Sequence, residues 1–180
     1  MQNNIKYLIE KKPHNNLLNL ALYNLDNIKV KEENLNVEGI NLDCLNAIIA
    51  LAFSVEAFIN FIGDGYIEGW NERDKYHKKL KVICDKADLK FDESVEPLST
   101  LKKLKFLRDN IAHGKPIREE VEFEIGTADE LNKKMEQSWD KNCNPVFVKG
   151  AYNFVLKFEN DILTAMGIDS GLTSTSAISL

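Results

Sequence analysis

Residues 42–62 read LDCLNAIIALAFSVEAFINFI, and this stretch decides the fold. Apolar side chains lie almost all round the helix that it would form, and within residues 47–62 only Ser54, Glu56 and Asn60 interrupt them. A helix that is apolar on every side belongs in the interior of a protein. Its most apolar part, residues 47–62, is shorter than the roughly 20 residues that a bilayer demands. We therefore expect a buried core helix and no membrane span.

Further apolar residues at helical spacing flank this core helix, and turn signals are few, since Gly and Pro together make up 13 of 180 residues. We expect one more helix to start at residue 67 or 71 and to carry Tyr76, Leu80 and Ile83 on one face. The other expected helices cover residues 2–11, 14–28, about 98–113, 128–140 and 145–166.

Between these helices we expect breaks and irregular segments. Gly63-Asp64-Gly65 is expected to end the core helix, residues 29–39 and 85–97 to be irregular, and residues 121–125 to be extended, because apolar and acidic residues alternate there. The tail from residue 167 to residue 180 is small and polar and is expected to be flexible. The sequence predicts one all-α helical domain over residues 1–166, with its core in residues 40–118 and 145–166.

Composition points to a cytoplasmic protein. Cys44, Cys84 and Cys143 are odd in number and widely spaced, and the N-terminal residues lack the apolar run of a signal peptide. The net charge of −5 opposes nonspecific attraction to nucleic acid. Residues 98–118, however, carry six basic side chains and one acid, a local charge of +5. The positive charge therefore gathers around one helix.

Arg108 lies among the apolar residues of this basic helix. The apolar side of the helix holds Leu101, Leu104, Leu107 and Ile111, and Arg108 falls inside the same arc. An unpaired guanidinium is costly to bury, so a partner or an open cleft is required. We infer that Glu56 of the core helix contacts Arg108. Such a pair could fix the register of two helices, or it could hold Arg108 ready for chemistry.

His113 follows Arg108 by five positions, at the expected end of the helix. An Arg and a His together suit phosphodiester chemistry, because the Arg can hold a phosphate and the His can exchange a proton near neutral pH. The alternative is a solvated His that caps the helix and interacts with the negative end of its dipole. His14 and His77 have no comparable context and are expected at the surface.

Cofactor and metal chemistry have no sequence support here. We find no phosphate-binding glycine loop, no HExxH, no GxSxG and no paired cysteine motif. The prediction is accordingly no cofactor and no metal.

The segment Arg108-Asp-Asn-Ile-Ala-His113 resembles the R-x4-6-H motif of the HEPN superfamily, and Ala50–Asn60 is similar to the earlier core helix of those domains, which carries a polar residue facing the motif Arg. The resemblance covers about residues 40–118 and a generic helix at 145–166. It implies a HEPN-like helical bundle and a metal-independent endoribonuclease, in which two protomers bring their motifs together across a two-fold axis.

The resemblance also implies roles for single residues. His113 would act as general base or acid, Arg108 would bind the phosphate, and Glu56 would orient Arg108, with Asn60 on the same helix face. The remaining expected contributors are Asp109 and Asn110, which would position the His or the substrate, and Lys105 and Lys115, which would bind RNA.

Two other interpretations stay open. The chain could be a non-catalytic HEPN-like binding or dimerisation module, with Glu56 and Arg108 as core residues and His113 as a cap. It could also be a toxin or defence factor held by a cognate antitoxin. The basic side chains could simply be the solvated faces of their helices; these are Lys102, Lys103, Lys105 and Lys115, and also Arg73, Lys75, Lys78, Lys79 and Lys81. Phe106, on the exposed side of its helix, could stack on a base or pack in a dimer interface.

Overall fold

The computed structural model describes residues 7–118, 120, 131, 134–137, 139–173 and 175–179. The predominantly helical character predicted from the sequence is confirmed. The helices are α1 (Pro13–Glu33), α2 (Ile40–Tyr66), α3 (Tyr76–Lys86), α4 (Leu98–Ala112) and α6 (Pro145–Ala165), with short 3-10 turns at Asp140–Asn142 and Ser170–Thr173. Two short strands, β1 (Tyr7–Glu10) and β2 (Ser176–Ser179), complete the described elements.

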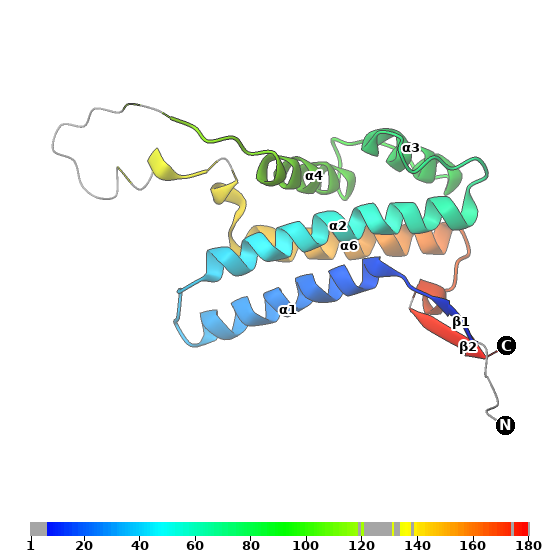
Figure 1. Ribbon diagram of the computed structural model, residues 1–180, viewed down its shortest axis with the longest axis horizontal. Helices are drawn as coiled ribbons and strands as arrows, with labels where there is room; N and C mark the ends of the chain where they lie inside the picture. The colour runs from blue at the N-terminus through cyan, green and yellow to red at the C-terminus, as the bar shows by residue number, and fades with distance from the viewer. Residues whose placement is uncertain are drawn as a thin grey trace, which may run out of the picture.

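Helix α2 runs through the middle of the bundle (Figure 1). It packs along α1 on one side and contacts α3, α4 and α6 on its other sides. This central place explains why its sequence is apolar almost all round, because helices pack against it from several sides. A narrow strip that includes Leu42 and Phe53 stays exposed.

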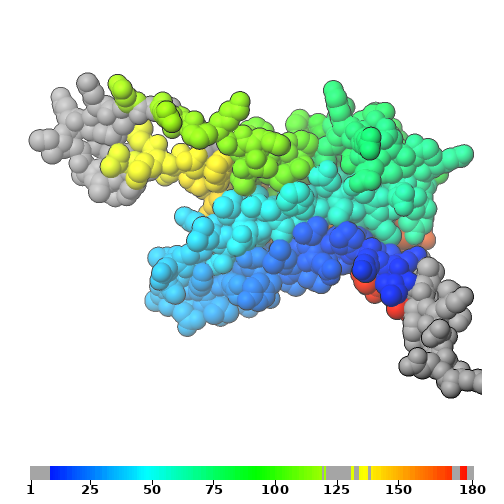
Figure 2. Space-filling view, viewed as in Figure 1, coloured from blue at the N-terminus to red at the C-terminus, as the bar shows by residue number. Residues whose placement is uncertain are grey.

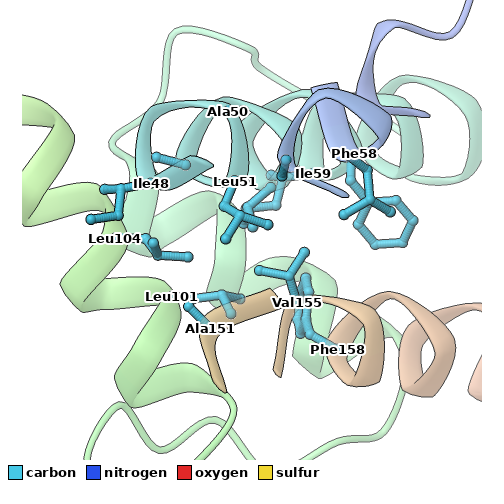
Figure 3. Close-up of a cluster of buried hydrophobic side chains, with 14 of the residues drawn as sticks. Ile48, Ala50, Leu51, Phe58, Ile59, Leu101, Leu104, Ala151, Val155 and Phe158 are labelled. Atoms are coloured by element: carbon cyan, nitrogen blue, oxygen red, sulfur yellow. The ribbon is translucent and has the colours of Figure 1, made fainter. Parts of the chain in front are cut away.

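The core is a single cluster of apolar side chains where α2, α4 and α6 meet (Figure 3). Leu51 and Ile59 of α2 lie close to Leu101 and Leu104 of α4 and to Val155 of α6, and all five are fully buried. Burial of one such side chain contributes about 1.5–3 kcal/mol. The expected core in residues 40–118 and 145–166 corresponds to these helices, and α1 adds Leu18, Ala21 and Ile28 to it.

By length and composition alone, α2 could cross a membrane, since its 27 residues include a strongly apolar window. In this structure 56% of that window is buried inside the molecule. This arrangement is typical of the core helix of a folded bundle. The absence of a membrane span stays a prediction.

The N-terminal and C-terminal segments differ from expectation. Residues 7–10 form strand β1 rather than a helix, and β1 pairs antiparallel with β2, which lies in the tail that we expected to be flexible. The register sets Tyr7 opposite Ser179 and Glu10 opposite Ser176. Neither strand is long enough to show a clear period of two, so the sequence around each one does not predict a strand. Their pairing joins segments far apart in sequence, which local patterns do not reveal.

Two helix ends also differ. α1 continues to Glu33, through half of the expected loop, and Lys31 in its last turn pairs with Asp43 of α2 at 2.6 Å. α2 continues through Gly63-Asp64-Gly65 to Tyr66, so these glycines do not break it. The reason at Gly63 is packing: the Trp70 indole lies where a side chain on residue 63 would be. The extended segment predicted at 121–125 lies outside the described residues, as does much of the helix predicted at 128–140.

Candidate functional site

Arg108 and Glu56 meet across the interface between α4 and α2. The Arg108 Nη2 donates a hydrogen bond to Glu56 Oε2 at 2.8 Å, and the two side chains are 19% and 31% exposed. The contact predicted from the two helical wheels is therefore confirmed. Partial burial strengthens the ion pair and also raises the cost of leaving either charge alone.

Asp109 brings a second carboxylate to the same guanidinium. Its Oδ1 lies 3.2 Å from Arg108 Nε, although the angle does not make a hydrogen bond. Asp109 Oδ2 also accepts from Lys105 Nζ one turn earlier. The side-chain charges of this group, which consists of Lys105, Arg108, Glu56 and Asp109, thus sum to zero. A phosphate that approached Arg108 would meet a guanidinium with two carboxylates already beside it.

Aromatic side chains complete the surroundings of this charged group. The Arg108 guanidinium lies over the ring of Phe53, 5.2 Å from its centre, and Lys105 Nζ lies 5.8 Å from the centre of the Tyr76 ring. Burial, reinforced by the negative charge of Glu56, raises the pKa of Tyr76 well above its ordinary value. Tyr76 is therefore a protonated phenol at neutral pH and cannot serve there as a base.

His113 is the C-cap of α4, and its backbone N–H donates to the Asp109 carbonyl at 2.9 Å. Its side chain is exposed. Asp109 and Asn110 lie half-buried in the last turn of the helix. No hydrogen bond or ion pair joins the His113 ring to Arg108 in the described part of the chain. The fold brings the motif to one helix end but leaves the His ring free at the surface.

Asn60 hydrogen-bonds to α3. Its Oδ1 accepts a hydrogen bond from Lys79 Nζ at 2.9 Å, and Lys79 is only 4% exposed. Lys79 is therefore no part of a solvated basic face, contrary to one sequence interpretation. The Asn60 amide oxygen is thus bonded to α3, no hydrogen bond joins Asn60 to Arg108 within the described residues, and its supporting role at the motif stays a prediction.

The two side chains expected to bind RNA, Lys105 and Lys115, differ in their exposure to solvent. Lys105 is half-buried and is engaged with Asp109, whereas Lys115 is exposed just beyond α4. Phe106 is 61% exposed, as the helical wheel predicted. The exposed groups near the end of α4 thus include one cation, one aromatic ring and one imidazole.

Two buried ionisable residues were missed. His14 was expected at the surface but is 1% exposed, stacked on Phe61 and edge-on to Phe58, with no hydrogen bond to either ring nitrogen from the described residues. Burial, aided by the charge of Lys12, lowers its pKa to about 4. Glu159 of α6 is 8% exposed, and burial raises its pKa to about 8. Helical spacing offered a signal, because His14 precedes Leu18 by four positions and Glu159 follows Val155 by four.

Two of the clefts lined by described residues have volumes of about 1020 and 350 Å³. Neither is lined by Arg108 or His113; the larger lies at the C-terminal end of α2 and the smaller between α4 and α6. Within the described ranges, no group of three or more His, Cys, Asp or Glu side chains is placed to hold a metal ion.

Comparison with protein-family models, with curated proteins and with solved structures found no match to this chain. The interpretation of the site rests on its geometry and on the motif.

Proposed function

We propose that the protein is a metal-independent endoribonuclease that uses Arg108 and His113. The observation that carries the proposal is the Arg108–Glu56 hydrogen bond, which fixes a guanidinium five positions before an exposed His at the end of one helix. A fixed guanidinium can stabilise negative charge that develops on a phosphate without first losing entropy.

In the proposed reaction the ribose 2′-OH attacks the neighbouring phosphorus. One His113 accepts the 2′-OH proton, and the bond to the 5′-oxygen breaks as that oxygen gains a proton. The products are a 2′,3′-cyclic phosphate and a 5′-OH end. In a symmetric dimer the motifs of the two protomers would face each other, so that one His113 acts as the base and the other as the acid. The chain therefore acts as a homodimer on RNA in this proposal.

Arg108 would hold a non-bridging phosphate oxygen through the edge of its fork that Glu56 leaves open. Asp109 competes for that edge, since it lies 3.2 Å from Nε. Substrate binding then requires the Asp109 carboxylate to move away from Arg108. Its ion pair with Lys105 can remain when it does so. Lys115 and Phe106, both exposed near this helix end, would contact the RNA backbone and a base.

Cleavage of a mixed RNA pool in EDTA tests the proposal. The purified wild type is compared with Arg108→Ala and His113→Ala, each checked for folding by circular dichroism. The matched controls are Arg73→Ala and His77→Ala, which alter an exposed Arg and an exposed His away from α4. We expect cleavage to fall at least 100-fold in the first two and to stay unchanged in the controls. The cyclic phosphate on the product identifies the mechanism.

A second function is favoured by the zero charge sum around Arg108 and by the absence, among the described residues, of a hydrogen bond between His113 and Arg108. In that case the chain is a non-catalytic helical binding or dimerisation module, and the Arg108–Glu56 pair fixes the register of α4 on α2. An inactive wild type that still forms a dimer by light scattering would support this module and would overturn the ribonuclease.

A further inference from the structure

The larger of these clefts lies at the C-terminal end of α2, between the residues that link β1 to α1 and the segment that follows α2. Figure 2 shows these two segments, in dark blue and green, at the same end of the molecule. It has a volume of about 1020 Å³, large enough for a small organic ligand. Arg108 and His113 do not line it. Any ligand bound there occupies a site separate from the proposed ribonuclease site.

Three aromatic side chains line this cleft: Phe61, Tyr66 and Trp70. Phe61 and Tyr66 meet edge to face with ring centres 6.1 Å apart, and Trp70 packs on α2 at Gly63. Aromatic faces carry partial negative charge and attract organic cations. The wall already shows this attraction, because Lys12 Nζ lies 5.5 Å from the centre of the Phe61 ring.

The charges that face the cleft favour a cation as well. Asp64 and Glu72 line it, are exposed, and have no ion-pair or hydrogen-bond partner among the residues described. Lys12 is paired with Glu10 at 3.0 Å, so these two charges cancel. Lys11 is exposed and opposes only one of the two free carboxylates.

The end of α2 adds to this negative potential. α2 is 27 residues long, ends at Tyr66, and carries no basic residue in its last turn. The last carbonyl groups of a helix give its C-terminus about half a negative charge. A Lys or Arg in the last turn can offset this charge, whereas here the last turn contains Asp64.

We infer that this cleft binds a small alkylammonium or guanidinium compound, with the cationic groups held by Asp64, Glu72 and the end of α2 and the alkyl chain lying on Tyr66 and Trp70. A linear polyamine has this chemistry, since it presents several ammonium groups on an apolar chain. An anionic nucleotide does not, because the free carboxylates and the helix end would repel its phosphate.

Tryptophan fluorescence offers a direct test, since the chain has only two tryptophans and Trp139 lies elsewhere, near Gly114. In a Trp139→Phe background, spermidine and agmatine are titrated while Trp70 emission is followed, with adenosine monophosphate as the anionic comparison. We expect a saturable change with the two cations that weakens with salt, and none with the nucleotide.

Matched variants separate this site from general attraction to an acidic protein. Asp64→Asn and Glu72→Gln should each weaken binding by roughly two- to five-fold. Glu68→Gln alters a nearby exposed acid outside the cleft and should leave binding unchanged. Arg108→Ala should also leave it unchanged. The inference is overturned by a flat titration with both cations, by binding of the nucleotide alone, or by equal weakening in the Glu68 variant.

Discussion

Arg108 of α4 donates to Glu56 of α2 at 2.8 Å, with four-fifths of its side chain removed from solvent. We predict that Glu56→Ala lowers the free energy of unfolding by about 1–3 kcal/mol, because the guanidinium keeps its desolvation cost but loses its best partner. Urea unfolding of Glu56→Leu, of Arg108→Met and of the double variant that combines them should show coupling of at least 1 kcal/mol. The exposed Lys81–Asp85 pair, at 2.6 Å, is the control and should show less than about 0.5 kcal/mol. Equal coupling in the two pairs would remove any special role for the buried one.

Asp109 restrains the proposed phosphate site, since it pairs with Lys105 and lies beside Arg108. We predict that Asp109→Asn strengthens RNA binding by roughly three- to ten-fold at low salt, because one more positive charge becomes available to phosphate. Filter binding at several salt concentrations should show a steeper salt dependence. Asp161→Asn, which breaks an exposed pair with Lys157 on α6, controls for the change in net charge. If both variants bind RNA equally, Asp109 does not restrain the site.

The contact between Glu56 and Arg108 could be predicted because both residues break apolar helix faces, and a charge on such a face needs a partner. The same reasoning would have placed His14 in the core, since it continues the spacing of Leu18 and Ala21. The signal at His14 is weaker, because a neutral His is tolerated on either side of a helix. The β1–β2 pair could not be predicted, because non-local pairing of four-residue strands depends on where the helices bring the two ends of the chain. The continuation of α2 through Gly63 depends likewise on packing against Trp70.

His14 should make the protein sensitive to acid. Its pKa is about 4 in the folded protein and 6.5 when unperturbed, so the folded state binds its proton less readily than the unfolded chain does. The contribution of neutral His14 to the free energy of unfolding is therefore fully present above pH 6.5. It falls by on the order of 2 kcal/mol as the pH drops toward 4. We predict that His14→Leu flattens this part of the pH profile, measured by urea unfolding from pH 4 to 8. His77→Gln, at an exposed site, should leave the profile as it is. An unchanged slope in His14→Leu would show that other groups cause the acid sensitivity.

Glu159 should act in the opposite direction. Burial raises its pKa from 4.5 to about 8, so the folded state holds the proton more tightly than the unfolded chain. The associated stability is present below pH 4.5 and is lost as the pH rises toward 8. We predict that Glu159→Gln, which keeps the shape without the charge, is about 1–2 kcal/mol more stable than the wild type at pH 8 and similar to it at pH 4.5. Unfolding at these two pH values gives the comparison, with the exposed Glu68→Gln as control. A variant that is less stable at pH 8 would mean that the carboxylate has a favourable role when ionised.

Gly63 and Gly65, two positions apart in the last turns of α2, should respond in opposite ways to alanine. A Cβ on Gly63 would lie 2.1 Å from Trp70 Cε2, so the indole would have to move, whereas a Cβ on Gly65 meets nothing within 4 Å. We predict that Gly63→Ala destabilises the protein by about 1–3 kcal/mol and shifts Trp70 emission, because a packed core resists an added methyl group. Gly65→Ala should stabilise it by about 0.5 kcal/mol through helix propensity. Thermal unfolding of both variants, with fluorescence in the Trp139→Phe background, makes the measurement. If Gly63→Ala were neutral and left the emission unchanged, Trp70 would not be packed against α2, and the aromatic wall of the proposed cation cleft would lose its support.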